Sequence, residues 1–233
     1  MGLLFPPECQ VCRSMLPLRD SSGVCPKCES QIQWIKPPHC AGCGRTLKNL
    51  KRALCGICES ESEPLNFDRA YACAAYQGPA REILHRYKFD RRIFLGNFLS
   101  NRILAFADKY LKKQDFDAVM AVPLDPKRHL SRGFNQSSLL SQKLSKAMKL
   151  KEISKLVARK SSSSCQSLLS RQERKANLRD CFFVTDKRSL ARFKRILLVD
   201  DIMTSGQTFS ECAKTLKKNG ARSVTAFAFA RGI

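Results

Sequence analysis

Four short segments in the last three quarters of the chain are rich in apolar or strand-forming residues, and they predict β-strands. They cover residues 69–76, 116–123, 195–200 and 223–230. The segments 116–123 and 195–200 are almost continuously apolar, a pattern typical of strands that are buried on both faces of a parallel sheet.

Between these strands, apolar residues recur at every third or fourth position, which predicts amphipathic helices. The predicted helices cover residues 79–89, 95–110, 135–150 and 209–220, the last one ending at a glycine cap. Strands that alternate with helices predict an α/β fold, in which helices cover both faces of a parallel sheet. Ligands of such folds bind at the carboxyl ends of the strands, so we expect a site beside residues 123 and 200.

The first 60 residues follow another pattern, four Cys-x-x-Cys pairs. The eight cysteines are Cys9, Cys12, Cys25, Cys28, Cys40, Cys43, Cys55 and Cys58. Zn²⁺ prefers thiolates, and a two-residue spacer lets both sulfurs of a pair reach one ion at ~2.3 Å. The gaps within the two halves are nearly equal, which indicates an internal duplication and predicts two structural Cys₄ zinc sites. Redox-active dithiols are the alternative, and the spacing fits both consecutive and cross-braced pairing.

An acidic segment at 59–64, ending in proline, separates the cysteine pairs from the strand–helix pattern. We therefore expect a double zinc ribbon at residues 1–62 and an α/β domain at 63–233. The formal net charge of the chain is +22, and 34 of its 42 basic residues lie in 63–233. This excess favours a polyanionic partner, such as nucleic acid or a phosphorylated ligand, over the alternative of a merely basic soluble surface.

No apolar run approaches the ~20 residues that span a bilayer, so we expect no transmembrane segment. The short apolar start at residues 1–7 lacks the basic residues of a signal peptide. Paired cysteines without a secretion signal favour metal binding in a reducing compartment, so we expect a cytoplasmic protein.

Residues 195–208, RILLVDDIMTSGQT, join a buried strand, two carboxylates, a loop of small and hydroxyl residues, and a helix. The free N–H groups of a helix N-terminus bind phosphate. Asp200 and Asp201 can accept hydrogen bonds from ribose hydroxyls, and a diol or Mg²⁺ between them and the phosphate avoids repulsion. We predict a site for a phosphorylated ribose, phosphoribosyl pyrophosphate with Mg²⁺. The alternative is a capped helix beside two solvated carboxylates.

This run resembles the phosphoribosyl-pyrophosphate motif of type I phosphoribosyltransferases. Further motifs are VPLDPKR at 122–128, RGFNQ at 132–136 and the cysteine pairs. On the strength of these motifs, the sequence resembles the ComF family over nearly the whole chain. That family is associated with DNA uptake in natural transformation, and its members place a zinc ribbon before a phosphoribosyltransferase-like domain. The resemblance therefore implies the same architecture and biology for this chain.

The resemblance also implies roles for single residues. Asp200 and Asp201 would hold the ribose hydroxyls and would be the catalytic residues of a transfer reaction. The residues implied to bind the 5′-phosphate are Met203, Thr204, Ser205, Gly206, Gln207 and Thr208. Those implied to bind pyrophosphate are Pro123, Leu124 and Asp125, with charge from Lys127, Arg128 and Arg132. Tyr76, Lys88 and Phe89 match further family positions, and residues 159–177 would close over the ligand.

Two functional hypotheses follow. In the first, the protein binds phosphoribosyl pyrophosphate or a related nucleotide together with single-stranded DNA, and works with DNA-uptake or recombination proteins. In the second, it is a Mg²⁺-dependent phosphoribosyltransferase of nucleotide metabolism that transfers the pentose to an unknown acceptor. The sequence supplies basic side chains that could stabilise a leaving pyrophosphate. It identifies no pocket for the acceptor and no unambiguous general base, although His85 and His129 are candidates for that role.

Overall fold

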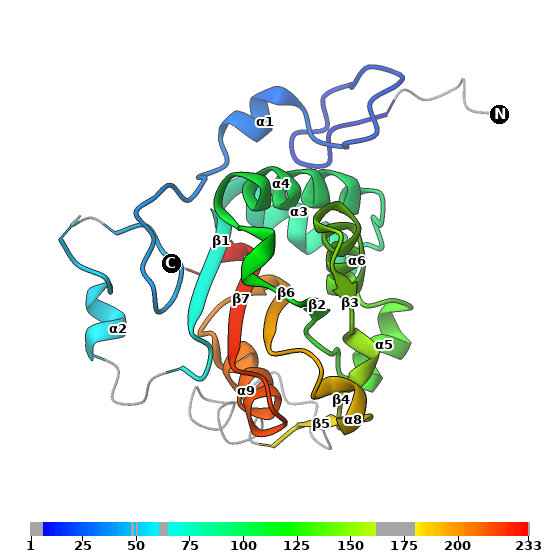
Figure 1. Ribbon diagram of the computed structural model, residues 1–233. Helices are drawn as coiled ribbons and strands as arrows, with labels where there is room; N and C mark the ends of the chain where they lie inside the picture. Colours follow the sequence, from blue (N-terminus) through cyan, green and yellow to red (C-terminus); the bar gives the residue numbers. More distant parts are fainter. Residues whose placement is uncertain (1–6, 48, 50, 61–64, 162–179, 233) are drawn as a thin grey trace.

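The central feature of the computed structural model is a parallel sheet of five strands in the order β1-β7-β6-β2-β3 (Figure 1). The structure describes residues 7–47, 49, 51–60, 65–161 and 180–232. The strands are β1 (Arg69–Ala75), β2 (Ala118–Ala121), β3 (Lys151–Glu152), β6 (Arg195–Met203) and β7 (Ser223–Arg231). All neighbouring pairs run parallel, which confirms the predicted α/β class.

Helices and a small hairpin cover the two faces of this sheet. One face packs against α3 (Gly78–Phe89), α4 (Leu95–Tyr110) and α6 (Gln136–Met148). The other packs against α9 (Gln207–Lys218), α8 (Lys187–Leu190) and the antiparallel pair β4 (Val157–Arg159) and β5 (Phe182–Val184). The short α5 (Pro126–Arg132) and the 3₁₀ turns η1 (Lys113–Asp115) and η2 (Ser154–Leu156) complete the connections. The central strands are therefore buried on both sides.

The predicted and observed strands differ most at their carboxyl ends. β6 is longer than predicted, because its pairing with β7 continues through Ile202↔Ala230 and Met203↔Arg231. Asp201, which the prediction placed just after the strand, consequently lies inside it together with Asp200. β2 is shorter than predicted, in keeping with Pro123, which lacks the N–H that a continuing ladder needs.

The N-terminal part consists of two similar halves. Each half begins with an antiparallel bridge, Glu8↔Met15 in the first and His39↔Thr46 in the second. Each then forms one short helix, α1 (Pro26–Ser30) or α2 (Gly56–Ser60), which starts directly after a cysteine of the second pair. The repeated order of bridge and helix supports the internal duplication that the cysteine spacing indicates.

This N-terminal part packs closely on the α/β part. Leu16, Val24 and Ile32 of the first half belong to the same buried cluster as α3 and α4. Between the halves, residues 33–35 pair with the free edge of β1, where Ile35 N–H donates to the Cys73 carbonyl (2.8 Å) and Ala75 N–H donates to the Gln33 carbonyl (2.9 Å). None of the helices within the described residues is both long and apolar enough to cross a bilayer.

Candidate functional site

The strand order reverses between β2 and β6, at the middle of the sheet. From β2 the chain continues outward to β3, whereas from β6 it continues to β7 on the opposite side. A crevice for a ligand is expected outside the carboxyl ends of the two strands at such a reversal. The two loops that carry the predicted site residues start at this place, and in the structure they cover residues 122–125 after β2 and 204–206 after β6.

The two carboxylates near the end of β6 are held by groups of two other elements, α3 and α6, and by a backbone N–H of β6 itself. The Ser137 hydroxyl in the first turn of α6 donates to Asp200 Oδ1, as does the N–H of Asp201 (2.8 Å). Lys88 Nζ, near the end of α3, lies 2.9 Å from Asp201 Oδ1, and both side chains are largely buried. Within the described part of the chain, all these contacts use Oδ1. Among the described residues, neither Oδ2 has a hydrogen bond or ion pair, and carboxylate oxygens are preferred ligands of Mg²⁺.

Burial of this pair changes its titration. Burial and the adjacent Asp201 together raise the pKa of Asp200 to about 7, against the opposing effects of Lys88 and Ser137. Burial, with a smaller contribution from Asp201, also raises the pKa of Tyr87, whose hydroxyl donates to the Gln136 carbonyl (3.1 Å). One lysine thus does not neutralise both carboxylates, and a bound cation would favour the doubly ionised pair.

The predicted phosphate loop connects β6 to α9. Gly206 has φ +84° and precedes the first residue of α9, while Thr204 and Ser205 are exposed. The exposed hydroxyls and the N-terminus of a 12-residue helix form a suitable surface for a phosphate. Met203 differs from the other predicted residues, because its side chain is buried in the core and its carbonyl accepts hydrogen bonds from Arg231 and Gly232.

The second loop, after β2, is held in place by side-chain hydrogen bonds. Asp125 is buried and accepts a hydrogen bond from Lys127 N–H at the start of α5 (2.9 Å). Asn135 Nδ2 donates to the Val122 carbonyl (3.2 Å), which connects this loop to the start of α6. Pro123 and Leu124 border a groove of about 510 Å³.

The basic residues predicted for pyrophosphate lie along α5. Lys127 and Arg128 are exposed, whereas the half-buried Arg132 has its guanidinium 5.0 Å from the centre of the Phe89 ring. Burial lowers the pKa of Arg132, and nearby Arg128 adds to this, while Asp200 and Asp201 act in the opposite direction. The structure thus brings the strand-end carboxylates and Arg132 near one another.

Two other predictions concern the closing segment and the histidine candidates for a general base. Residues 162–177 of the predicted closing segment lie outside the described residues, so that prediction stays open. His85 and His129 are exposed on α3 and α5.

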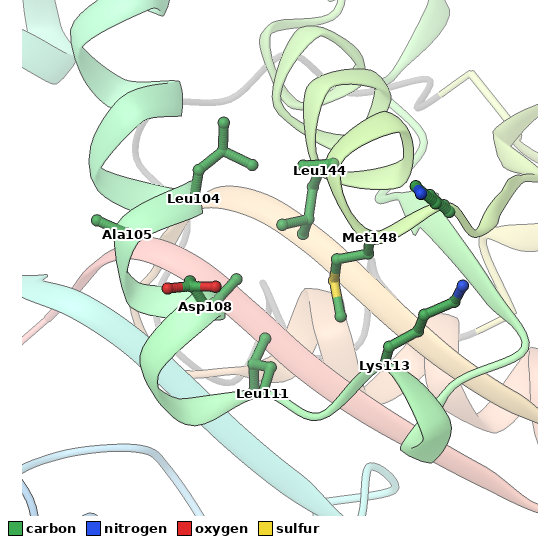
Figure 2. Close-up of a pocket in the computed structure, with 10 residues that line it drawn as sticks. Leu104, Ala105, Asp108, Leu111, Lys113, Leu144 and Met148 are labelled. Atoms are coloured by element: carbon green, nitrogen blue, oxygen red, sulfur yellow. The ribbon is translucent and has the colours of Figure 1, made fainter.

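A larger hollow lies elsewhere, between the C-terminal halves of α4 and α6 (Figure 2). Its volume is about 720 Å³, and its walls include Leu104, Leu111, Leu144 and Met148. Since α4 leads into β2 and α6 leads into β3, this hollow is at the amino ends of the strands. It contains none of the predicted site residues, and the strand-end crevice is the better candidate.

The eight paired cysteines form two compact groups. Cys9, Cys12, Cys25 and Cys28 make one group and Cys40, Cys43, Cys55 and Cys58 the other, with all sulfurs of a group within 4.8 Å of one another. The Sγ atoms of Cys12 and Cys25 are 3.7 Å apart, and those of Cys43 and Cys55 are 3.6 Å apart. A tetrahedral site with Zn–S bonds of about 2.3 Å has sulfur separations of about 3.8 Å. Both groups therefore fit Zn²⁺, with the pairs combined consecutively.

Backbone groups complete these sulfur sites. Cys25 N–H donates to Cys9 Sγ (3.3 Å), and Cys55 N–H donates to Cys40 Sγ in the equivalent place (3.2 Å). Such donors stabilise thiolate charge around a metal. Four sulfurs leave no open coordination position, so both sites are structural rather than catalytic.

Comparison with known proteins matches two stretches of the chain to family models. The family model described as a double zinc ribbon domain matches residues 1–59, and that of a phosphoribosyl transferase domain matches residues 130–232. Along nearly its whole length the chain is similar to Competence protein F of Haemophilus influenzae, at 30% identity over 96% of each chain. The chain belongs to the ComF family. It is also similar to DNA utilization protein YhgH of Escherichia coli K12, at 32% identity over 98% of this chain and 99% of that protein. Competence protein ComFC of Streptococcus pneumoniae is 31% identical over 94% and 92% of the two chains.

Several residues of this ComF-family site were not predicted with a role. Lys88 was noted only as a matching family position, and its ion pair with Asp201 joins residues far apart in the sequence. Ser137 and Gln136 follow Asn135, where the sequence pattern indicates only the start of a helix. Gln136 Nε2 is buried without a hydrogen-bond partner among the described residues. No spacing in the sequence relates these groups to the carboxylates, because the sheet brings them together.

Proposed function

We propose that this ComF-family protein binds phosphoribosyl pyrophosphate with Mg²⁺ between β2 and β6, and handles single-stranded DNA during DNA uptake. The observation that carries the first part is the meeting of two loops at the reversal of strand order, with Asp200 and Asp201 beside the N-terminus of α9. Such a site offers carboxylates, hydroxyls and helix N–H groups to one ligand.

Each part of the ligand has a matching group in this proposal. The two Oδ2 atoms of Asp200 and Asp201 would accept from the ribose hydroxyls or coordinate Mg²⁺. The segment 204–208 would bind the 5′-phosphate, and the loop 123–125 with Lys127, Arg128 and Arg132 would bind pyrophosphate. Mg²⁺ would supply charge neutralisation between the carboxylates and the phosphate oxygens.

Charge and the relatives support the second part. The strongly basic residues 63–233 suit a polyanion, and the relatives carry names of competence and DNA utilization. Proteins of DNA uptake or recombination are the partners that this role requires. We also propose a cytoplasmic location, because thiolate zinc sites need a reducing compartment.

Transfer of the pentose is the second candidate function, and one observation favours it. Without a bound cation, Asp200 has a pKa of about 7, which is the range of a group that accepts or releases a proton at neutral pH as a general acid or base. Release of labelled pyrophosphate in the presence of candidate acceptors would support transfer, whereas binding without release would favour the first function.

Calorimetry of the zinc-loaded protein with phosphoribosyl pyrophosphate and Mg²⁺ tests the ligand directly. We expect binding that weakens at least tenfold in the double variant Asp200→Asn/Asp201→Asn, because the ribose and Mg²⁺ lose their acceptors. Asp108→Asn, which removes an exposed carboxylate beside the hollow of Figure 2, is the control. Unchanged affinity in the double variant would contradict the proposal.

Salt dependence tests the DNA part. Single-stranded binding that depends on phosphate contacts weakens as salt rises, with a slope of about −0.7 in log–log units per contact. We expect fluorescence-anisotropy titrations of an oligonucleotide at several salt concentrations to give a slope of log affinity against log salt that corresponds to several phosphate contacts. A flat response would exclude the electrostatic binding proposed here.

A further inference from the structure

Arg231, the last residue of β7, connects the second cysteine group to the end of β6. The side chain is only 3% exposed. Its Nε donates to the Cys43 carbonyl (3.0 Å), and one terminal nitrogen donates to the Met203 carbonyl (2.9 Å). One guanidinium thus bridges the turn that carries a sulfur ligand and the residue just before the phosphate loop.

A second arginine strengthens the same connection. Arg45 Nε donates to the Gly232 carbonyl (3.2 Å), and its terminal nitrogen lies 3.5 Å from Cys43 Sγ. Gly232 N–H donates to the Met203 carbonyl (2.8 Å). A Cβ added to Gly232 would lie 3.3 Å from Thr204 Cα, so the chain end touches the first residue of the phosphate loop.

The charges of this cluster balance only when zinc is bound. Among the described residues, neither Arg45 nor Arg231 forms an ion pair with a carboxylate. Four thiolates around one Zn²⁺ carry a net charge of −2, which matches the two guanidinium groups. An uncompensated buried charge is costly, so the metal-filled site and the two arginines stabilise each other.

The first cysteine group has different neighbours. Its helix α1 is connected to α4 through an ion pair between Glu29 and Arg102, on the face of the sheet that α3, α4 and α6 cover. Within the described residues, the hydrogen bonds from a cysteine residue to Arg231 and Arg45 involve Cys43 of the second group, and Arg231 in turn donates to the Met203 carbonyl. The two zinc sites are therefore not equivalent with respect to the phosphate loop.

We propose that Arg231 is a positioning residue that couples the second zinc site to the phosphate loop. Zinc at Cys40, Cys43, Cys55 and Cys58 fixes the Cys43 turn, and Arg231 transmits this order to Met203 and Thr204. Because coupling between two binding sites is reciprocal in binding free energy, a ligand in the loop raises the zinc affinity of the second site. Only this last statement depends on the proposed ligand.

Hydrogen exchange of the zinc-loaded protein tests the coupling without any ligand. In Arg231→Gln we expect amide exchange over residues 203–208 to become at least tenfold faster, while both zinc ions stay bound. Arg52→Gln is the matched control, since Arg52 lies in the same half and pairs with exposed Glu59 instead. Unchanged exchange over 203–208 in Arg231→Gln would overturn the proposal.

A milder pair of variants keeps the test valid where Arg231→Gln does not fold. Arg45→Gln removes the parallel connection to Gly232, and Arg231→Lys keeps the charge but loses one of the two bridges. We expect intermediate increases in exchange over 203–208 in both variants. Exchange equal to the wild type in both would overturn the coupling.

Zinc affinity provides the reciprocal test. Equilibrium competition with a coloured chelator, with and without phosphoribosyl pyrophosphate and Mg²⁺, measures the zinc affinity. The variant Cys12→Ser, in which the first site has lost a ligand, identifies the second site. We expect the ligand to raise the zinc affinity of the second site roughly 5–100-fold, and this effect to vanish in Arg231→Gln. An equal gain at both sites, or a gain that survives in Arg231→Gln, would overturn the coupling. Absence of any calorimetric binding would instead contradict the proposed function and leave the exchange experiment to decide the coupling.

Discussion

Asp200 has a higher pKa than an exposed aspartate because it is partly buried beside a second carboxylate. Its folded-state pKa of about 7 lies above the unfolded value, so the folded state binds more protons between these two values. Stability contributed by this group is present at low pH and is lost as pH rises toward 7. The site thus keeps a carboxyl that lowers stability at neutral pH, which is common where a group serves a ligand.

We predict that Asp200→Asn stabilises the protein at pH 8 by about 1–3 kcal/mol, because the amide carries no charge to be buried. The gain should fall to about half at pH 5.5, where the folded wild type is already protonated. Urea unfolding at both pH values measures the difference, with Asp108→Asn as the control. A gain independent of pH would mean that the pKa of Asp200 is not raised.

Lys88 compensates the other carboxylate, Asp201, which is 4% exposed. We predict that Lys88→Met lowers the free energy of unfolding by about 2–4 kcal/mol, because Asp201 is left buried and unpaired. Adding Asp201→Asn should restore part of the loss, and a double-mutant cycle from urea unfolding gives the coupling. Strictly additive effects of the two changes would show that the ion pair contributes nothing.

At the scale of elements, the connection between β6 and α9 depends on Gly206. Its φ of +84° is strained for other residues, and an added Cβ would lie 3.1 Å from Leu65 Cδ1. Gly133 has a similar φ of +80° but open space around its Cβ position. A comparison of alanine substitutions at these two glycines therefore distinguishes the cost of backbone strain from the cost of steric contact.

We predict that Gly133→Ala costs about 1 kcal/mol of stability and Gly206→Ala about 2 kcal/mol, since only the second also puts a methyl group in tight contact with Leu65. Thermal and urea unfolding of both variants measure the two losses. Equal losses would mean that Leu65 moves away without cost.

The elements that the sequence predicts well are those with a strong period. Apolar residues at helical spacing predict α4, and continuous apolar runs predict β6 and β7. The spacing of the cysteine pairs predicts the two sulfur sites. β3, β4 and β5 are only two or three residues long, too short to show a period. Lys88 and Arg231 escape prediction for another reason: their partners, Asp201, Cys43 and Met203, come from other elements, and only the folded sheet brings them together.

At the scale of the whole molecule, the N-terminal part and the α/β part share one buried cluster. Leu16, Val24 and Ile32 pack with residues of α3 and α4. The first half contains few apolar residues besides its cysteines, so we expect its order to depend on metal as well as on this packing. Loss of zinc should therefore affect residues far from the sulfur atoms.

We predict that chelation of zinc lowers the melting temperature of the entire protein, and that the zinc-loaded protein unfolds in one calorimetric transition. Circular dichroism at 222 nm follows mainly the helices of the α/β part, since the helices of the N-terminal part that the structure describes are the short α1 and α2. A helix signal whose midpoint is unaffected by chelation would show that the α/β part is stable by itself.

The pairing of residues 33–35 with β1 has one more consequence. A strand at the border of a sheet offers unpaired N–H and C=O groups to any extended peptide, and this is a common route to aggregation. Here the protein covers that border with its own chain, through Gln33 and Ile35. At the other border, β3 has only two residues, a length that gives little template for a foreign strand. The connection between the two zinc-binding halves thus also protects the sheet from self-association.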